Sequence, residues 1–444
     1  MKKINSYVFG FSIAMSAVVL IFLSFVISLF VSTQRYSTQL ENVYKESLYQ
    51  LVQNVDDLQV DMSKFVATTS EPLQREILTN IRTLCTLAVG NLNVLPISQN
   101  KTTNINKFFN LVSGYSQSLI DKINSNKNVS SEEYKNFESL FEQCNKIYYD
   151  LNNFVYSTDY DYRVLSEVKF TSADDSVFSA GIASGDNPES ELPTLIFDGP
   201  FAESVVAKSI NGLSMNYLSK EECDNRVKTM LEFFDGYNYI YSGETNSKFE
   251  TFNYVLEKAS HRIYLQITKR DGLLINLTSY GAGGDKNMSL DDAGDLSLEC
   301  ALNFGFENME VVWGMENGNI AYINLAPVIN DVVYYPDLIK VKVDKRLGVV
   351  VGWDAVNYAY NHVERSEFES EYGILEGEAD LNPLLEVKFK RKVLIPNKYS
   401  GEMFAYEYVC EWNDYVYYIY LDSLTGNEVK IMRMISTNSG NLLL

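Results

Sequence analysis

The chain has 444 residues, 46% of them hydrophobic and 13% aromatic, and a formal net charge of −21 at pH 7. This length corresponds to about three domains, and the composition excludes wholesale disorder. The negative charge argues against nucleic acid as a partner, because phosphates need basic patches. It permits a basic protein partner without identifying one.

The cysteine content argues against both a disulfide framework and a zinc site. The five cysteines are an odd number, and no C-x-x-C pair occurs among them. Paired spacings are what structural zinc sites and small disulfide scaffolds show. We therefore expect buried free thiols at Cys85, Cys144, Cys223, Cys300 and Cys410.

Residues 1–35 predict a short N-terminal tip and a membrane anchor. No charged residue occurs in 4–34, and 7–31 is almost wholly apolar. A helix of about 25 residues is longer than the roughly 30 Å hydrocarbon core of a bilayer, so it can span that core with some tilt. The preceding pair Lys2 and Lys3 favours a cytoplasmic N-terminus.

A cleaved signal peptide is the competing interpretation of this segment. Its apolar core would span about 7–15 residues and would end in small residues of the A-x-A kind. Here the core is longer, and the chain leaves it as Phe30-Val-Ser-Thr-Gln-Arg35. We therefore favour an uncleaved anchor, with the bulk of the chain outside the membrane that holds it.

Residues 36–160 predict a helical bundle. A heptad-like apolar seam marks the first helix, and Pro72 marks the start of the second, because proline suits a first helical turn. After a polar interruption, a third helix is predicted at about 105–123, and the capping box Ser130-Ser-Glu-Glu133 opens a fourth that ends near Phe154. The seam consists of Leu40, Tyr44, Leu48, Leu51, Val55, Leu58, Met62 and Phe65.

This seam has two possible uses. Four antiparallel helices would bury it within one chain, whereas a homodimeric coiled coil would bury it between two copies. The sequence leaves both open, so a homo-oligomer through the helical stalk is one of the expectations.

Three modules are predicted after the bundle. Residues 161–192 are rich in serine, aspartate and glycine and predict a linker. The modules then span 193–284, 285–360 and 361–444, each with a helix followed by four strands. A helix on one face of an antiparallel sheet is an α+β unit, so the predicted fold class is α+β.

The module helices begin at recognisable signals. Ser219-Lys-Glu-Glu222 and Ser289-Leu-Asp-Asp292 are capping boxes, and a weaker helix follows Ile374, where Gly377 and Pro383 both oppose helix. Strands are predicted near 237–241, 249–257, 260–268 and 272–279 in the first module, 308–314, 319–325, 337–344 and 348–354 in the second, and 385–394, 402–410, 414–422 and 427–434 in the third.

The last two strands of each module repeat one phrase. Alternating apolar residues run into a short polar turn with one glycine, and a second apolar run follows, which indicates a β-hairpin with one buried face. The glycines are Gly272, Gly348 and Gly426, which lie 76 and 78 residues apart. A repeated module of this kind favours binding over catalysis.

The modules and the phrases between them resemble known families. The helix with four strands that closes in x-V-x-V-D-x-x-x-G-x-x-V resembles the PepSY domain. The connecting phrases are more specific and resemble the spore germination protein YpeB family, and with the anchor and the bundle this resemblance covers nearly the whole chain. These phrases are Pro193-Thr-Leu-Ile-Phe-Asp-Gly-Pro-Phe201, Tyr335-Pro-Asp-Leu-Ile-Lys-Val-Lys-Val343 with Gly348 and Gly352, Asn361-His-Val-Glu-Arg365, Arg391-Lys-Val-Leu-Ile-Pro396 and Tyr406-Glu-Tyr408. Gly377 departs from the family pattern, which usually has a better helix former there.

The resemblance implies a function. It implies a non-catalytic germination protein of endospore-forming bacteria that stabilises, localises or restrains a cortex-lytic peptidoglycan hydrolase of the SleB kind. It also implies a single-pass protein of the spore inner membrane with its bulk on the cortex side. A PepSY-type protease inhibitor or chaperone is the alternative, followed by an enzyme that acts on the wall itself.

No catalytic, cofactor-binding or metal-binding residue is predicted. His261 and His362 lie 101 residues apart without metal-ligand spacing. The glycine-rich stretch 281–286 ends in Lys286 and is followed by Asn287, where a phosphate loop would have serine or threonine after the lysine. Acidic clusters could supply a glycosidase carboxylate pair, but clusters this close in sequence are more typical of solvated surface. They are Glu189 with Glu191, Glu367 with Glu369 and Glu371, and Glu376 with Glu378 and Asp380.

Three tryptophans, Trp313, Trp353 and Trp412, are candidates for a partner surface. Structural packing is the stronger expectation for them, because tryptophan side chains are usually mostly buried.

Overall fold

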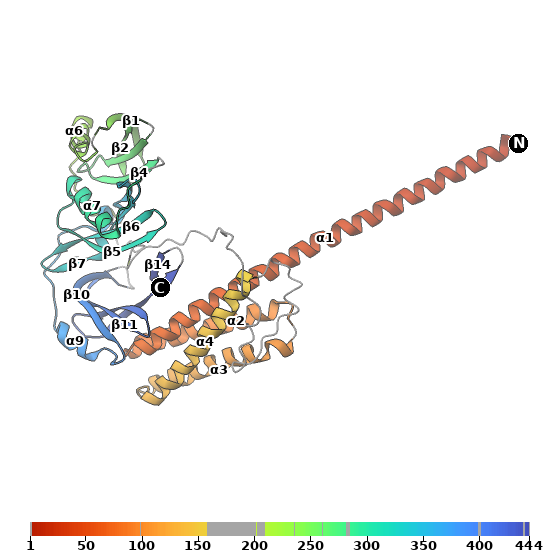
Figure 1. Ribbon diagram of the computed structural model, residues 1–444, viewed down its shortest axis with the longest axis horizontal. Helices are drawn as coiled ribbons and strands as arrows, with labels where there is room; N and C mark the ends of the chain where they lie inside the picture. The colour runs from red at the N-terminus through yellow and green to blue at the C-terminus, as the bar shows by residue number, and fades with distance from the viewer. Residues whose placement is uncertain are drawn as a thin grey trace. The chain divides into compact units, whose positions relative to one another are not determined.

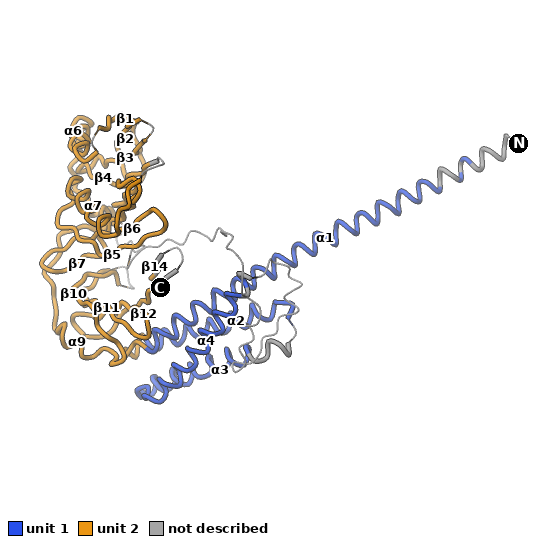
Figure 2. Tube along the Cα trace, in the orientation of Figure 1, with its two compact units in different colours: residues 1–66, 74–187 blue, residues 67–73, 188–444 orange. Residues whose placement is uncertain are grey.

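The computed structural model describes residues 2–97, 99–157, 201, 209–234, 236–259, 261–280, 285–397, 401–437 and 440–443. The predicted linker at 161–192 lies outside the described residues. The chain divides into two compact units: a helical unit of residues 1–66 and 74–187, and a C-terminal unit of residues 67–73 and 188–444 (Figure 2). The α+β fold class is confirmed, since the helices come first and a large sheet with its own helices follows (Figure 1).

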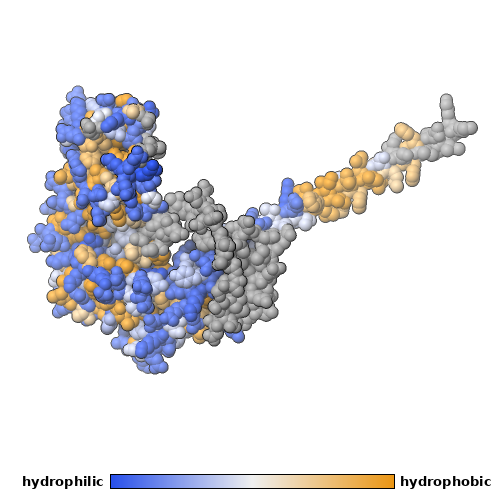
Figure 3. Space-filling model, viewed as in Figure 1, coloured by the Kyte–Doolittle hydropathy of each residue, from blue (hydrophilic) through white to orange (hydrophobic). Residues whose placement is uncertain are grey.

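Helix α1 runs from Lys2 to Ala67 and carries the predicted anchor. Its most apolar 18-residue window has a mean hydropathy of 2.6, and none of that window is buried within the protein. Figure 3 shows this part of α1 as a continuous hydrophobic surface. The helix is therefore long and apolar enough to cross a membrane, which makes it a candidate membrane span.

The rest of α1 packs with α2 (Glu71–Val94), α3 (Gln99–Asn124) and α4 (Ser131–Ser157). The rings of Phe65 on α1 and Phe137 on α4 have centroids 4.5 Å apart. The seam side chains from Leu48 to Phe65 are at most 5% exposed. This part of the seam is thus used inside one chain, and it is not available to a homodimeric coiled coil.

The helix boundaries follow the sequence signals with one exception. The capping box of α4 is confirmed, because the Ser130 N–H donates to the Glu133 carboxylate at 2.7 Å and the Glu133 N–H donates to Ser130 Oγ at 3.3 Å. Helix α3 begins at Gln99, earlier than the predicted 105. The polar residues before 105 predict an interruption, but polarity alone does not oppose a helix, whereas proline does. Helix α2 ends at Val94, just before Pro96.

The C-terminal unit contains three repeats of one helix and four strands. The first repeat has α6 (Lys220–Met230), β1 (Asn238–Asn246), β2 (Glu250–Lys258), β3 (His261–Thr268) and β4 (Leu274–Tyr280). The second has α7 (Leu290–Asn303), β5 (Met309–Asn317), β6 (Ile320–Ile329), β8 (Ile339–Asp344) and β9 (Val349–Asp354). The third has α9 (Ile374–Asp380), β10 (Glu386–Pro396), β11 (Glu402–Trp412), β12 (Tyr415–Asp422) and β13 (Glu428–Thr437). Four short elements were not predicted: β7 (Val332–Tyr334), the 3-10 turn η1 (Tyr335–Asp337), α8 (Val356–Asn361) and β14 (Gly440–Leu443).

The repeats join edge to edge in one 14-stranded sheet. Its order is β1-β2-β3-β4-β9-β8-β6-β7-β10-β11-β12-β13-β14, with β5 paired to β6 beside this path. Strand β4 pairs antiparallel with β9, so that Leu277 lies opposite Trp353, and β7 pairs parallel with β10, so that Val333 lies opposite Val393. Two pairings, β4 with β9 and β7 with β10, thus join neighbouring repeats. Among the described strands, β1, β5 and β14 each pair with one neighbour.

The first two repeats share one hydrophobic core. Val227 and Met230 of α6, Ala301 of α7 and Trp353 of β9 belong to the same buried cluster. Burial of these side chains holds both helices on the sheet, because each methylene that is removed from water contributes on the order of 0.8 kcal/mol to stability. The third repeat contributes instead to a separate cluster that includes Val393, Tyr420 and Tyr335.

The closing hairpins of the three repeats are confirmed as β3–β4, β8–β9 and β12–β13. Their turn glycines Gly272, Gly348 and Gly426 have φ of 63°, 66° and 71°, a left-handed conformation that glycine adopts without a Cβ penalty. The strand register shifts shortly before each glycine, between Gln266 and Ile267, Lys342 and Val343, and Tyr420 and Leu421. The repeated phrase is therefore also a repeated backbone geometry.

Each hairpin turn also binds the segment that leads into its own helix. The carbonyl three residues before the glycine accepts a main-chain N–H from that segment in all three repeats. The pairs are Leu218 N–H to Lys269 O at 2.8 Å, Met288 N–H to Lys345 O at 3.3 Å and Tyr372 N–H to Ser423 O at 3.0 Å. Helix and hairpin are thus locked together by the backbone.

Helix α9 forms despite Gly377. The residue is buried, and a Cβ at this position would collide with the hydroxyl of Tyr408. That hydroxyl donates to the Ile374 carbonyl oxygen at 2.7 Å. The glycine that opposes helix by propensity is thus required by close packing.

Candidate functional site

His362 lies in a cluster of ion pairs where the second and third repeats meet. Asp337 of η1 is 1% exposed, and its two carboxylate oxygens accept hydrogen bonds from Arg365 at 2.7 and 2.8 Å. Arg365 also donates twice to Glu402, at 2.8 Å each. The His362 ring places Nδ1 2.8 Å from Asp337 and stacks on Tyr358.

The same region contains a second, fully buried network. Glu407 is 0% exposed and accepts hydrogen bonds from the Tyr335 hydroxyl at 2.6 Å and from Arg391 Nε at 2.7 Å. Burial alone lowers the pKa of Arg391, but the neighbouring Tyr335 and Glu407 outweigh this effect and raise it. The guanidinium therefore stays charged and neutralises the buried carboxylate, as such a pair requires.

The phrases that carried the family resemblance converge here. Tyr335 and Asp337, Asn361 to Arg365, Arg391 and Glu407 come from four of them. The fifth ends in Phe201, whose ring centroid lies 5.2 Å from that of Tyr335. The phrases are thus specific because together they form the contact between the second and third repeats, which we call the joint. Their role in the joint is structural.

Neither histidine is arranged for catalysis among the described residues. The dyad of His362 and Asp337 has no hydroxyl or thiol within the described chain on its other ring nitrogen. His261 begins β3, as predicted, and bridges the Tyr237 hydroxyl to Ser279 Oγ, which lies 2.7 Å from its Nε2. Burial lowers the pKa of His261, but in a serine-hydrolase triad a carboxylate orients the base, and here a tyrosine occupies that place.

The other candidate residues from the sequence are the tryptophans, the cysteines and the acidic clusters. The tryptophans are buried, at 6%, 2% and 8% exposed for Trp313, Trp353 and Trp412. The five cysteines are free and buried, as expected. Of the acidic clusters, Glu189 and Glu191 lie outside the described residues, and Glu367, Glu369 and Glu371 are exposed. In the last cluster, Glu376 accepts a hydrogen bond from the Gly373 N–H, and Glu378 forms an ion pair with Lys390. Within the described chain, no group of three or more His, Cys, Asp or Glu side chains is placed to hold a metal ion.

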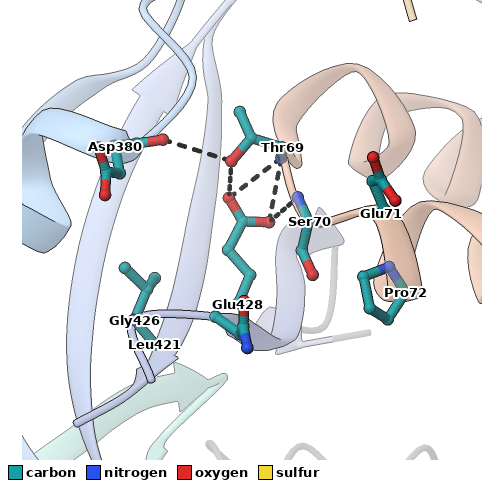
Figure 4. Close-up of a pocket in the computed structure, with 9 residues that line it drawn as sticks. Thr69, Ser70, Glu71, Pro72, Asp380, Leu421, Gly426 and Glu428 are labelled. Atoms are coloured by element: carbon teal, nitrogen blue, oxygen red, sulfur yellow. Dashed lines mark hydrogen bonds between the residues drawn. The ribbon is translucent and has the colours of Figure 1, made fainter. Parts of the chain in front are cut away.

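A polar site that the sequence reading missed lies in the third repeat, around Glu428 at the start of β13 (Figure 4). Glu428 is 6% exposed. It accepts hydrogen bonds from the Thr69 hydroxyl at 2.8 Å, from the Thr69 N–H at 3.1 Å to either oxygen, from the Ser70 N–H at 3.4 Å and from the Thr68 hydroxyl. These donors belong to residues 67–73, which group with the C-terminal unit.

A pocket of about 310 Å³ adjoins this contact. It is lined by Thr69, Ser70, Glu71, Pro72, Asp380, Leu421, Gly426, Asn427 and Glu428. The Thr69 hydroxyl also lies 3.3 Å from the Asp380 carbonyl oxygen, at the end of α9. Figure 4 shows Glu428 reaching from β13 to the Thr69–Ser70 backbone. The arrangement can bind hydrogen-bond donors.

The sequence held a signal for this site. Glu428 lies two residues after the hairpin glycine, and the matching residues of the other repeats are Leu274 and Val350. Both of these are fully buried. A carboxylate in a register that is otherwise buried and apolar needs a partner, so aligning the three hairpins would have singled out Glu428.

Comparison with known proteins identifies the family. The family model "YpeB sporulation, PepSY1 and PepSY2 domains" matches residues 184–367, and the model "YpeB N-terminal" matches residues 32–160. The chain belongs to the YpeB family. The PepSY match ends before the third repeat, although that repeat has the same order of helix and strands.

Full-length relatives support the assignment to the YpeB family. The sporulation protein YpeB of Halalkalibacterium halodurans is 24% identical over 90% of this chain and 92% of its own length. The sporulation protein YpeB of Bacillus subtilis is 21% identical, with 89% and 90% covered. The solved Bacillus megaterium YpeB C-terminal domain covers 49% of this chain and 98% of its own, with 20% identity and a TM-score of 0.44.

Proposed function

We propose that this protein is a non-catalytic, membrane-anchored germination factor that stabilises, localises or restrains a cortex-lytic peptidoglycan hydrolase of the SleB kind. It would lie in the spore inner membrane with a cytoplasmic N-terminus and with its bulk on the cortex side. The observation that carries this proposal is membership of a sporulation family over both the helical and the PepSY regions. The apolar part of α1 supports the anchor, and Lys2 and Lys3 support the orientation.

The domain organisation belongs to the same proposal. Residues 1–35 are the tip and anchor, 36–160 the helical bundle and 161–192 a linker. Residues 193–284, 285–360 and 361–444 are then three PepSY-like modules. The shared hairpin geometry of Gly272, Gly348 and Gly426 supports counting the third repeat as such a module.

A scaffold role suits the chemistry of the described residues. The buried carboxylates Asp337 and Glu407 are neutralised by arginines, and Glu428 is bound to main-chain and hydroxyl donors. Such groups hold a structure together rather than exchange protons with a substrate. A tether adds to this role, because it raises the local concentration of a bound enzyme at the membrane.

The test is deletion of the protein from spores, followed by measurement of the hydrolase in the dormant state. We expect the hydrolase to be lost from the inner-membrane fraction or to become active early, and the full chain to restore it. A chain that starts at residue 36 behind a cleavable signal peptide is the matched control for the anchor, and it should restore localisation poorly. Unchanged hydrolase abundance, location and activity in the deletion strain would sink the proposal.

The alternatives give different outcomes in two further assays. A wall-active enzyme would release fragments from purified cortex without added hydrolase. A PepSY-type inhibitor or chaperone would be cross-linked in dormant spores to a protease rather than to the hydrolase. The proposed scaffold predicts no fragment release and a hydrolase cross-link.

A further inference from the structure

Glu428 is a buried charge to which no described residue of its own repeat donates a hydrogen bond. Its donors among the described residues all come from residues 68–70, which lie about 360 positions earlier in the chain. Removing a carboxylate from water costs several kcal/mol unless charge-assisted hydrogen bonds replace the water. A glutamate used only to complete the hairpin would be costly, since Leu274 and Val350 complete the other two hairpins without charge.

The donors form a specific pattern. Two successive main-chain N–H groups, those of Thr69 and Ser70, point at one carboxylate, and two threonine hydroxyls complete the set. Helix α2 begins directly afterwards, at Glu71. Hydrogen bonds to an ionised acceptor are about twice as strong as neutral ones.

We propose that Glu428 makes the third repeat a recognition site for a Thr-Thr-Ser turn at the start of a helix, and that residues 67–73 are its built-in occupant. The first and second repeats lack this property because an apolar side chain occupies the matching position. The site binds the main-chain N–H groups of the turn and selects threonine through two hydroxyl contacts. Pro72 restricts the backbone after the turn, which lowers the entropy lost when the turn is bound.

Hydrogen exchange of the full chain in detergent micelles tests this inference. In the variant Glu428→Leu we expect the amide of Thr69 to exchange about tenfold faster or more, because its charged acceptor is gone. The amide of Ser70 should also exchange faster, but by less, because Thr68 Oγ1 remains as a second acceptor at 3.3 Å. The amides of β12 and β13 should stay protected, because leucine fits this register in the first repeat. Glu411→Leu, an exposed glutamate of β11 in the same repeat, is the matched control and should change neither.

A second variant separates recognition from mere folding. Thr69→Val removes one hydroxyl but keeps both N–H groups and keeps Thr68 Oγ1, to which the Ser70 N–H also donates at 3.3 Å, so exchange at Ser70 should rise less than in Glu428→Leu. Adding Glu428→Leu to Thr69→Val should give the rate of Glu428→Leu alone, since both changes act on one contact.

Three outcomes would overturn the inference. The first is unchanged exchange at Thr69 and Ser70 in Glu428→Leu. The second is an effect of Thr69→Val on exchange that multiplies with that of Glu428→Leu. The third is loss of protection throughout the third repeat in both Glu428→Leu and Glu428→Gln, which would make Glu428 a folding residue. These measurements use the protein alone, so they do not depend on the proposed hydrolase partner.

Discussion

Glycine has two opposite uses in this chain. In the hairpins, Gly272, Gly348 and Gly426 supply a left-handed backbone that other residues adopt only with strain. In α9, Gly377 lies in a helix, and it is needed because the Tyr408 hydroxyl occupies the space of a Cβ. The sequence predicts the first use from turn patterns, whereas the second depends on a tyrosine 31 residues away and has no local pattern.

Gly377→Ala should therefore destabilise the protein although alanine is the better helix former. Overpacking typically costs 1–3 kcal/mol, and the propensity gain of about 1 kcal/mol offsets it only in part. We expect a net loss of about 1 kcal/mol, measured from urea unfolding followed by circular dichroism, which reports on both units. The control Gly114→Ala in α3, where nothing lies within 4 Å of the new Cβ, should leave stability unchanged or raise it. A gain at position 377 would contradict the packing argument.

The strands and helices themselves were largely predictable from the sequence. Period-two alternation located all four strands of each repeat, and the capping boxes of Ser219 and Ser289 located two helices. The parallel pairing of β7 with β10 was not predictable, because β7 has only three residues and its partner lies in the next repeat. The partners of Glu428 were not predictable either, since they lie about 360 residues away in sequence, although alignment of the hairpins marks Glu428 itself.

The joint between the second and third repeats depends on Arg365, which the sequence presented only as part of a phrase. Arg365→Met would leave Asp337 buried beside His362 without its guanidinium partner. Removing one member of a buried ion pair typically costs 3–5 kcal/mol. We expect a loss of about this size in the urea midpoint of the C-terminal unit, which contains all three tryptophans and so reports by fluorescence.

Arg262→Met is the matched control at the element scale. Arg262 pairs with Glu257 at 2.9 Å, but its side chain is 59% exposed, and surface pairs contribute about 1 kcal/mol or less. Equal losses for Arg262→Met and Arg365→Met would show that the joint does not depend on its buried charges.

Across the whole molecule, buried thiol and phenol groups make the stability of the folded chain fall at high pH. Burial raises the pKa of the Cys85 thiol from 9.0 to about 12, of Cys410 to about 12, and of the Tyr418 hydroxyl from 10.0 to about 12. The unfolded chain therefore releases these protons at a lower pH than the folded chain does. Their stabilising contribution is complete below about pH 9 and is lost as the pH rises toward 12.

We thus expect the melting temperature to fall steeply between pH 9 and the upper end of this range. The helical unit contains Cys85, so Cys85→Ala should flatten the pH dependence of helix melting measured by circular dichroism, whatever its effect at neutral pH. A melting temperature that stays constant from pH 8 to pH 11 would contradict the burial of these groups.

The edge-to-edge sheet has a consequence for biogenesis. Strand β7 finds its parallel partner 60 residues later, where Val332 lies opposite Lys392. During synthesis from the N-terminus, the nascent polypeptide exposes the backbone of β7 until residue 394 has emerged, and open backbone of this kind invites pairing with foreign strands. Ribosomal pauses or premature stops between residues 334 and 394 should consequently yield aggregation-prone products, while arrest after residue 394 should not.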